Sequence, residues 1–582
     1  MTRLFNDPAD FADEMIDGFV AANSRQVRKV TGGVVRSTRT PEGTVAVVIG
    51  GGSGHYPAFG GIVGQGLAHG AAMGNLFASP SAQQVESVAT SANRGGGVLL
   101  SYGNYAGDVL HFTQAQAKLV AAGIPTRSVA VTDDISSAPL AEKHKRRGIA
   151  GDLTVFKSAA AAAEAGYSLD EVVRVAELAN ERTRSFGVAF SGCTLPGADT
   201  PLFSVPEGRM AVGMGIHGEP GIDETDVPTA DGLASLFVES LLAELPDGIE
   251  SAAGNRVGVI LNGLGSVKYE ELFVVYRRIA ALLAEAGLEV IDPEVGELVT
   301  SFDMAGASLT LFWLDEELEG FWCAAADTPA YRKGSIAAAE QLEASEIEAE
   351  LAVVIPDASA ESQEAARVAS LAVAAIAAVV DENADELGRI DAVAGDGDHG
   401  IGMQRGARAA AAAASGALAA GAGAHTLLDI AGEAWANKAG GTSGALWGVA
   451  LSSVGAELGD TGAPDSAAVA AGVAAARDGI MSFGKAEVGD KTMVDALVPF
   501  SETLTQQVTA GAPLADAWKT AADVATAAAV ATADLLPRMG RARPHAEKSL
   551  GTPDAGAHSF GLIVQAIASV LATAAPITKE EK

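Results

Sequence analysis

The sequence predicts an α/β amino-terminal half followed by an all-helical carboxyl-terminal domain, and three observations support this division. Over residues 1 to about 335, short β-type apolar runs alternate with helical patterns, which favours mostly parallel sheets flanked by helices. From about residue 360 onward, alanine-rich segments carry apolar residues at helical spacing. Between them, residues 335–365 are rich in Glu, Ala and Ser, which is typical of a flexible connection reaching on the order of 30 Å.

The first half is expected to contain short buried strands, each followed by a loop of Gly, Asn or Asp and then a helical segment. The clearest strand runs are residues 45–49, 98–100, 129–131 and 257–261. Ligands of such sheets usually bind at the loops after the strands' carboxyl ends. In the second half, helical patterns cover residues 368–380, 427–435, 515–536 and 560–574. We therefore expect domains at 1–335 and 362–575, joined by a linker at 336–361.

Composition excludes several classes of function. The 582 residues include 39 basic and 73 acidic side chains, so the formal net charge is −34. A polyanion repels nucleic acid and anionic lipid, and we expect neither as a partner. Two cysteines are too few for a disulfide framework or a cysteine-ligated zinc site, which favours a reducing, cytoplasmic setting. The first residues lack the apolar core of a signal peptide, and the long apolar runs, mostly alanine, are shorter than a membrane span.

A glycine-rich segment, GGGSGH at residues 50–55, directly follows the first predicted strand. Glycines let a backbone turn sharply and present N–H donors to a small ligand. An incidental glycine-rich turn is the alternative, because the chain contains 68 glycines. The segment is not a phosphate-binding Walker loop, because no Gly-Lys-Ser/Thr follows.

Two further loops carry candidate catalytic side chains. Asp108 follows the strand at 98–100 and stands where a loop becomes the helix expected at 109–122. It is either an N-cap or a carboxylate base at a strand end. His217 lies among glycines in the segment GMGIHGEPG at 213–221, where a ligand can approach the imidazole. A structural or merely exposed histidine is the alternative.

In the second half, Asp391, Asp396 and Asp398 occur within eight residues and alternate with glycines. Hard divalent cations prefer oxygen ligands, so this cluster indicates a Mg²⁺ site. A solvated acidic turn and a Ca²⁺ loop remain alternatives, although the glutamate that ends a Ca²⁺ loop is missing. Glycine-containing patches at 440–445, 489–495 and 551–557 stand at expected helix ends, where N–H groups can meet phosphates.

Taken in order, these motifs closely resemble those of the dihydroxyacetone kinase family. Residues 262–265 (NGLG) and 300–306 (TSFDMAG) share in the resemblance, which runs from Phe5 to about Val564. The resemblance implies that His217 adds through a ring nitrogen to the carbonyl of a ketose, forming a hemiaminal that discriminates ketoses from polyols such as glycerol. It implies that Asp108 takes the proton from the attacking hydroxyl and that His55 assists as acid or base. The substrate-binding residues implied are Gly52, Ser53, Gly54, His55, Asp108 and His217.

For the second half, the resemblance implies an antiparallel eight-helix barrel that binds ATP. Asp391, Asp396 and Asp398 would hold Mg²⁺. The residues expected to line ATP are Asp396, Gly397, Asp398, His399, Thr442, Ser443, Gly484, Thr492, Met493, Asp554, Ala555 and Gly556. Segment 540–545 (GRARPH) departs from the family pattern, although Arg541 can still reach a phosphate. The family also implies a homodimer, and the fused layout favours free ATP as the phosphoryl donor.

One departure from the family concerns the sugar. The family's usual Lys-Asn-Tyr-Thr-Gly-Asp before the base reads GNYAGD here, so Gly103 replaces the lysine. Losing a long cation is expected to enlarge the pocket and remove a donor, which can change discrimination between similar sugars. We therefore consider erythrulose at least as good a candidate as dihydroxyacetone. The competing hypothesis is a non-enzymatic ligand-binding or sensor protein of the same fold.

Overall fold

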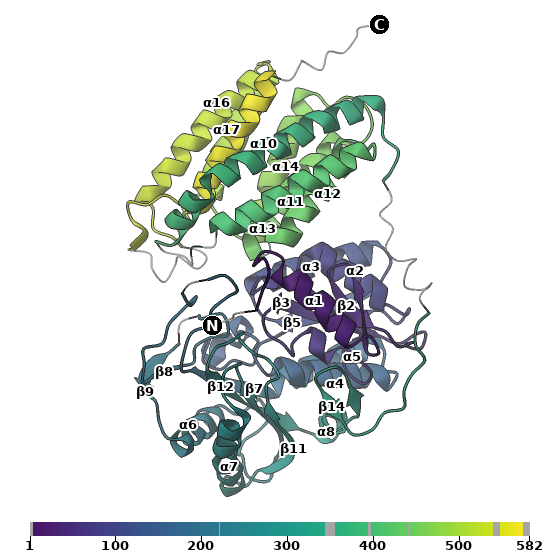
Figure 1. Cartoon of the computed structure of the whole chain (residues 1–582), viewed down its shortest axis with the longest axis vertical. Helices are drawn as coiled ribbons and strands as arrows, with labels where there is room; N and C mark the ends of the chain where they lie inside the picture. The colour runs from purple at the N-terminus through teal and green to yellow at the C-terminus, as the bar shows by residue number, and fades with distance from the viewer. Residues whose placement is uncertain are drawn as a thin grey trace. The chain divides into compact units, whose positions relative to one another are not determined.

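The computed structural model describes residues 4–198, 200–219, 221–343, 355–393, 397, 399–439, 441–538 and 548–573. The chain divides into two compact units, Met1–Leu351 and Ala352–Lys582, which are described separately (Figure 1). The division falls inside the segment predicted as a linker. The first residues of that segment lie along the first unit, where the Leu342 N–H donates to the Ser37 carbonyl and the Ala339 N–H to the Gln65 side chain.

The first sheet of the first unit has six strands in the order β1-β2-β4-β3-β5-β6. Its strands are β1 (Val27–Val30), β2 (Gly33–Arg36), β3 (Ala46–Ser53), β4 (Gly70–Leu76), β5 (Val98–Gly103) and β6 (Thr126–Val131). Neighbours from β4 through β3 and β5 to β6 run parallel, whereas β1 and β2 pair antiparallel. The three strands predicted at 45–49, 98–100 and 129–131 are confirmed as β3, β5 and β6, and their carboxyl ends share one edge.

The second sheet has the order β11-β10-β12-β7-β8-β9. Its strands are β7 (Thr183–Ala189), β8 (Arg209–Val212), β9 (Asp223–Asp226), β10 (Arg256–Gly263), β11 (Glu289–Gly296) and β12 (Gly306–Leu314). The predicted strand at 257–261 is confirmed as β10. However, only β10 and β11 pair in parallel here, so the expectation of mostly parallel sheets is wrong for this sheet. Apolar runs predict strands but not their direction, and β12 inserts between β10 and β7 with reversed polarity. A two-stranded ribbon, β13 (Ala326–Asp327) with β14 (Arg332–Lys333), follows.

Helices cover the sheets of the first unit. They are α1 (Phe11–Ala22), α2 (Ala82–Ala92), α3 (Ala106–Ala121), α4 (Asp152–Glu164), α5 (Leu169–Glu181), α6 (Ala230–Leu242), α7 (Tyr269–Glu285) and α8 (Glu316–Trp322). Capping boxes start α2 at Ser81 and α5 at Ser168, where a serine hydroxyl and a residue three positions later satisfy free main-chain groups. Helices α6 and α7 lie side by side against the second sheet (Figure 1).

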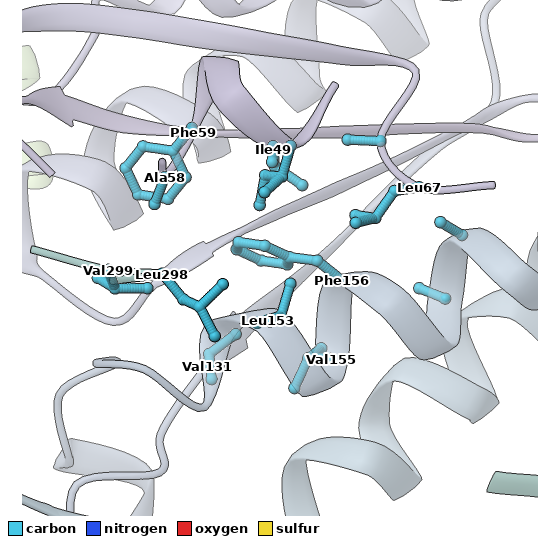
Figure 2. Close-up of a cluster of buried hydrophobic side chains, with 14 of the residues drawn as sticks. Ile49, Ala58, Phe59, Leu67, Val131, Leu153, Val155, Phe156, Leu298 and Val299 are labelled. Carbon is cyan, nitrogen blue, oxygen red and sulfur yellow. The ribbon is translucent and has the colours of Figure 1, made fainter. Parts of the chain in front are cut away.

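Helix α4 is buried on nearly every face, because its sequence DLTVFKSAAAAAE carries small and apolar residues around the whole circumference. Leu153 and Phe156 of α4 contact a core that includes Ile49 of β3 (Figure 2). Leu298 and Val299, from the loop between β11 and β12, belong to the same cluster (Figure 2). The helix therefore packs between β3, an interior strand of the first sheet, and the loop that precedes β12.

The second unit is helical, as predicted. The helices of its described residues are α10 (Ala360–Asp391), α11 (His399–Ala419), α12 (Ala424–Ala439), α13 (Gly441–Leu458), α14 (Ser466–Gly484), α15 (Val494–Thr509), α16 (Leu514–Ala531) and α17 (Ala555–Thr573). Each helix packs against the next along the chain, and α17 packs against α10, so the contacts close a ring.

The core of the ring combines alanines with a few aromatic rings. Trp435 of α12 stacks on Trp447 of α13 with ring centroids 5.1 Å apart, and Phe560 of α17 packs beside Trp447. Gly406 of α11 lies against Trp435, where a β-carbon would be only 2.5 Å from the indole. By length and composition alone, α10 and α17 are apolar enough to span a membrane; within the ring, their apolar side chains contribute to this core.

Candidate functional site

Two histidines from separate sheets meet at the carboxyl edge of the first sheet. His55 stands two residues beyond the end of β3, and His217 lies in the loop between β8 and β9. Their Nε2 atoms are 3.0 Å apart, and the ring planes are nearly perpendicular at 81°. The structure thus brings together two of the three predicted catalytic residues, although 162 positions separate them in the chain.

His55 is fixed in place by a hydrogen bond and a ring contact. Its Nδ1–H donates to the Thr300 carbonyl at 2.7 Å, and its ring stacks on Phe77 at 5.0 Å. Only 2% of the residue is exposed. Burial, with a contribution from His217, lowers the pKa of His55 to about 3, so the ring is neutral at physiological pH.

His217 is oriented by a carboxylate that the sequence reasoning missed. Glu219 accepts a hydrogen bond from His217 Nδ1 at 3.1 Å through Oε1 and from the His217 main-chain N–H at 3.0 Å through Oε2. The Tyr105 ring meets the His217 ring edge-on at 4.7 Å. A glutamate two residues after a candidate histidine was visible in segment 213–221, but the sequence does not show that the loop folds back on itself.

Charged side chains behind Glu219 keep it ionised. Arg147 lies 3.6 Å from Glu219 Oε2, and its guanidinium also donates to Asp134 at 2.8 and 3.1 Å. Burial favours the neutral acid, but His217 and Arg147 outweigh it and lower the pKa of Glu219 well below its ordinary value. The imidazole of His217 therefore faces a full negative charge.

Asp108 is buried beside this pair. It belongs to the first turn of α3, whose N-cap is Tyr105, so the capping alternative does not apply. The residue is 7% exposed, and Oδ1 has no hydrogen-bond partner among the described residues. Burial raises the pKa of Asp108 to about 7, although Ser79 and His217 favour the ionised form. A carboxyl that gains and loses a proton near neutrality suits general-base chemistry.

The glycine-rich segment differs from the expected turn. Gly50, Gly51 and Gly52 continue strand β3 and are buried, because glycine alone fits where neighbouring chain comes close. A β-carbon on Gly51 would lie 2.4 Å from the Phe59 ring, and one on Gly52 would lie 2.8 Å from the Ala78 nitrogen. The chain turns only at Gly54, which has a φ of +102°. The Ser53 hydroxyl donates to the Gly74 carbonyl at 2.6 Å.

Tyr105 and Gly148 lie close to Gly103. A β-carbon there would lie 3.1 Å from Cε2 of Tyr105 and 3.4 Å from the Gly148 carbonyl oxygen. The Tyr105 hydroxyl donates to that same carbonyl at 3.0 Å. The Tyr105 ring therefore lies next to the place where a side chain at 103 would begin.

In the second unit, the predicted nucleotide residues come from one end of the helix ring. Consecutive helices pack against one another and reverse direction, so the amino termini of α11, α13, α15 and α17 lie at one end of the ring. Two hydrogen bonds at this end of the ring support the arrangement. The His399 side chain of α11 bonds to the Ser559 hydroxyl of α17 at 3.0 Å, and the Arg538 N–H donates to the Asp490 carbonyl. Converging helix amino termini attract anions such as phosphates.

Most of the residues predicted to line ATP lie at or near the ends of these helices. His399 begins α11, and Thr442 and Ser443 are exposed in the first turn of α13. Gly484 ends α14, and Thr492 and Met493 directly precede α15. Asp554 precedes α17, and Ala555 and Gly556 open that helix; a β-carbon on Gly556 would lie 3.4 Å from that of Met493. Gly397 is described between α10 and α11 with a φ of +77°, whereas Asp396, Asp398 and Arg541 lie outside the described residues.

Two residues that sequence reasoning did not single out hold this end together. The Lys491 ammonium, 5% exposed as a residue, donates to the Leu535 carbonyl at 3.1 Å and to the Ser549 carbonyl at 2.8 Å. Asp495 accepts main-chain N–H groups from Gly489 and Thr492 at 2.6 and 2.8 Å. The loop before α15 is therefore fixed from both sides.

Three described carboxylates, Asp391, Asp495 and Asp554, lie at this end of the ring. Asp391 ends α10, and the buried Asp554 stands in the electric fields of Asp495 and Asp391. Burial, together with these fields, raises the pKa of Asp554 to about 7. Within the described residues no three His, Cys, Asp or Glu side chains group closely enough to hold a metal, so the predicted Mg²⁺ site depends on Asp396 and Asp398.

Comparisons with known proteins cover both units. A Dak1 domain model matches residues 17–330, and a DAK2 domain model matches residues 393–569. The chain is 65% identical to an L-erythrulose kinase of Pectobacterium atrosepticum, over 98% of this chain and 97% of that protein. It is 56% identical to a D-erythrulose kinase of Mycolicibacterium smegmatis, over 98% of each. A solved dihydroxyacetone kinase from C. freundii, in complex with AMP-PNP and Mg²⁺, is 30% identical over 98% of this chain and 99% of that one, with a TM-score of 0.52.

Proposed function

Because the chain belongs to the dihydroxyacetone kinase family, we propose that it transfers the γ-phosphoryl group of ATP to a terminal hydroxyl of a short-chain ketose. The observation that carries this proposal is the close pair of His55 and His217 beside the buried carboxyl of Asp108. This group offers a nucleophile, an acid and a base in one place. A non-enzymatic binding protein would have no use for the base.

In the proposed reaction, His217 holds the sugar covalently. Its Nε2 adds to the ketone carbon and forms a hemiaminal, which a polyol without a carbonyl cannot do. The reversible bond fixes the terminal hydroxyl in place, so part of the entropic cost of orienting the substrate is met on binding. The contact between Glu219 and Nδ1 directs the other nitrogen, Nε2, toward the substrate.

Asp108 serves as the base for the phosphoryl-transfer step. Its unpartnered oxygen accepts the proton of the terminal hydroxyl as that oxygen attacks the γ-phosphorus. The pKa of about 7 lets the carboxyl accept this proton and release it afterwards.

The helical unit binds the nucleotide. Residues at the amino termini of α11, α13, α15 and α17 line ATP, and Asp391, Asp396 and Asp398 hold the metal. Mg²⁺ bound with ATP supplies positive charge that offsets the charge developing on the phosphate oxygens. Carboxylates can approach phosphates only through such a cation, which explains how so acidic a chain handles a polyanion.

We propose a four-carbon ketose, erythrulose, as the preferred substrate over dihydroxyacetone. Gly103 in place of the family lysine supports this, as does the similarity to relatives that are erythrulose kinases. We further propose a ketose-binding domain at residues 1–335 and an ATP-binding domain at residues 362–575, joined by a linker at residues 336–361. The proposed setting is a cytoplasmic homodimer with neither nucleic acid nor membrane as a partner.

A substrate panel tests the proposal. Mg²⁺-dependent ATP consumption is measured with dihydroxyacetone, D-erythrulose and L-erythrulose, and NMR locates the phosphate on the product. We expect the highest kcat/KM with one erythrulose enantiomer. A clear preference for dihydroxyacetone would reject the four-carbon assignment, and no turnover with any of the three would favour the binding-protein hypothesis.

A further inference from the structure

Asp152 is a buried carboxyl that the proposed mechanism does not use. It stands in the first turn of α4 and is 3% exposed, and its Oδ1 atom has no hydrogen-bond partner among the described residues. A buried polar atom without a partner costs about 1–3 kcal/mol of folding free energy. Such a group therefore needs an explanation, for example a role in the reaction or a bound ligand or water.

A structural role at the start of α4 is already filled by another carboxyl. Asp133, which is fully buried, accepts the main-chain N–H groups of Ile149 and Gly151 at 2.9 Å each and so fixes the loop that leads into the helix. An acidic residue in a first turn also interacts favourably with the helix dipole, typically by about 0.3–1 kcal/mol. That gain does not explain why Asp152 is buried with one oxygen free.

The Asp152 carboxyl borders the end of strand β5. A β-carbon on Gly148 would lie 2.5 Å from the Gly103 α-carbon and 2.6 Å from Asp152 Oδ1, so one small group at that point would touch both. Gly103 ends β5 at the carboxyl edge of the first sheet, where ligands of such sheets usually bind. Because both positions are glycine, neither places a side chain beside the free oxygen.

The neighbours of Asp152 also contact the proposed reacting groups. The Tyr105 hydroxyl donates to the Gly148 carbonyl at 3.0 Å, and the Tyr105 ring meets the His217 ring at 4.7 Å. Burial raises the pKa of Asp152 well above its ordinary value, and the charge of Asp108 contributes to this rise, so the two carboxyls lie within electrostatic range of each other. Asp152 therefore approaches the ketose-binding edge of the sheet from α4.

We propose that Asp152 is a ketose-binding residue that selects a four-carbon ketose, because its Oδ1 atom forms a hydrogen bond with a hydroxyl that dihydroxyacetone lacks. This inference rests on the proposed function and deepens it. His217 is assigned to the ketone carbon and Asp108 to the attacking hydroxyl. Erythrulose carries three hydroxyls and dihydroxyacetone two, so the additional hydroxyl has no partner until Asp152 supplies one. A hydroxyl both donates and accepts, so it pairs with the carboxyl in either protonation state.

The free oxygen of Asp152 also explains why dihydroxyacetone would be disfavoured. Dihydroxyacetone would leave the buried carboxyl without a partner, whereas erythrulose would satisfy it. Sites built to hydrogen-bond a substrate hydroxyl reject an analogue without that hydroxyl strongly, because their own polar groups are then left unpaired. Removal of the Asp152 carboxyl is therefore expected to weaken the reaction of erythrulose and to spare that of dihydroxyacetone.

The variants Asp152→Ala and Asp152→Asn test the assignment by steady-state kinetics with both ketoses. In Asp152→Ala we expect kcat/KM for erythrulose to fall about tenfold or more, with kcat/KM for dihydroxyacetone and the KM for ATP changed by less than about threefold. The amide of Asp152→Asn keeps an acceptor of the same shape and should retain most of the preference. Asp170→Ala, which removes an exposed acidic side chain from the first turn of α5, is the matched control and should change neither ketose. An equal fall for both ketoses in Asp152→Ala would show a structural role and overturn the inference.

Analogues that lack one hydroxyl test the contact in the unaltered protein, so this test does not depend on how a variant folds. 1,3-Dihydroxybutan-2-one lacks the C4 hydroxyl of erythrulose, and 1,4-dihydroxybutan-2-one lacks the C3 hydroxyl. Isothermal titration measures the affinity of each, whether or not it is phosphorylated. We expect one analogue to bind the parent protein about tenfold more weakly than erythrulose, and the difference to shrink below about threefold in Asp152→Ala. If neither analogue binds the parent protein more weakly than erythrulose, the contact is rejected and a bound water is the partner of the carboxyl.

The outcomes separate this inference from the proposed function. If erythrulose is phosphorylated and preferred equally by the parent protein and by Asp152→Ala, the proposed function stands and the inference fails. If no ketose is phosphorylated but Asp152→Ala still weakens the binding of erythrulose about tenfold, the kinase function fails and the contact stands.

Discussion

The ring of Tyr105 lies over Gly103, so closely that a β-carbon on the glycine would be 3.1 Å from ring atom Cε2. The same ring meets His217 edge-on, and its hydroxyl donates to the Gly148 carbonyl. A side chain at 103 would therefore crowd the Tyr105 ring, and that ring contacts the imidazole that is proposed to capture the sugar. We therefore predict that position 103 affects the reacting atoms through Tyr105.

Gly103→Ala should shift the Tyr105 ring by a few tenths of an ångström and disturb the position of His217. Small misplacements of a catalytic group are costly, so we expect kcat/KM for the ketose to fall about tenfold, with an unchanged KM for ATP. Steady-state kinetics measures both. Gly18→Ala in α1, where a new β-carbon would meet nothing within 4 Å, is the control. Equal ketose kinetics in the two variants would rule out this role for Gly103.

The pKa of Asp108 predicts a pH dependence of turnover. A base must be ionised to accept a proton, and burial raises the pKa of this carboxyl to about 7. We therefore expect kcat to rise with pH through an apparent pKa near 7 and Asp108→Asn to lose at least two orders of magnitude in kcat. A pH profile from 5 to 9 checks this. A flat profile, with chemistry rate-limiting, would argue against Asp108 as the base.

The raised pKa of the Asp108 carboxyl, which suits it to act as a base, is also expected to lower the stability of the folded protein at high pH. Between pH 4 and 7 the folded protein holds a proton on Asp108 that the unfolded chain has lost, so stability falls as pH rises through this window. Above pH 7 the buried charge costs about 4 kcal/mol. Asp108→Asn should therefore unfold at a higher temperature than the parent protein at pH 8, with the gain vanishing by about pH 4. A variant less stable at pH 8 would contradict this.

His217→Ala should leave the fold intact and remove the discrimination for ketones. Without the imidazole, a ketose and the matching polyol differ only in weak hydrogen bonds, so their kcat/KM values should approach one another as ketose activity collapses. Competition between erythrulose and erythritol measures the ratio. His144→Ala, at an exposed position, is the control. A retained preference for the ketose in His217→Ala would show that something other than covalent capture selects it.

We expect Lys491 to affect nucleotide binding, although it is not one of the residues predicted to line ATP. Lys491→Met removes the donor that joins the Leu535 and Ser549 carbonyls, so buried acceptors lose their partner and the loop before α15 loosens. We expect the KM for ATP to rise about tenfold and the free energy of unfolding of the helical unit to fall by about 1–3 kcal/mol. Lys519→Met on the exposed face of α16 should change neither. Unchanged ATP kinetics in Lys491→Met would refute the role.

Asp396→Ala tests the metal assignment. We expect the binding of MgATP to collapse while the ketose still binds, because the two ligands are assigned to different units. Isothermal titration of each ligand measures this. An unchanged affinity for MgATP would remove Asp396 from the metal site.

The sequence predicted the elements of the fold better than their directions. Apolar runs identified β3, β5, β6 and β10, because burial selects such residues in any sheet. They could not predict that β12 enters the second sheet antiparallel, because strand direction depends on contacts far apart in the chain. The alanine-rich texture predicted an all-helical second unit, since alanine favours helix and permits close packing.

The sequence predicted the catalytic residues of the candidate site but not the side chains that hold them in position. Family resemblance pointed to His55, Asp108 and His217, and the structure places the two histidines in contact. Glu219 and Tyr105 were missed because their role depends on how one loop folds back and how one ring fills the space over Gly103. The glycines of β3 were read as a ligand-binding turn, although they mainly allow neighbouring chain to pack closely.

Covalent capture of the sugar by His217 is the central claim, and a crystal structure of the protein soaked with erythrulose tests it most directly. We predict continuous density between Nε2 of His217 and a tetrahedral C2 of the sugar, with the terminal hydroxyl directed at Asp108. A sugar bound with a planar carbonyl and no bond to the imidazole would contradict the account.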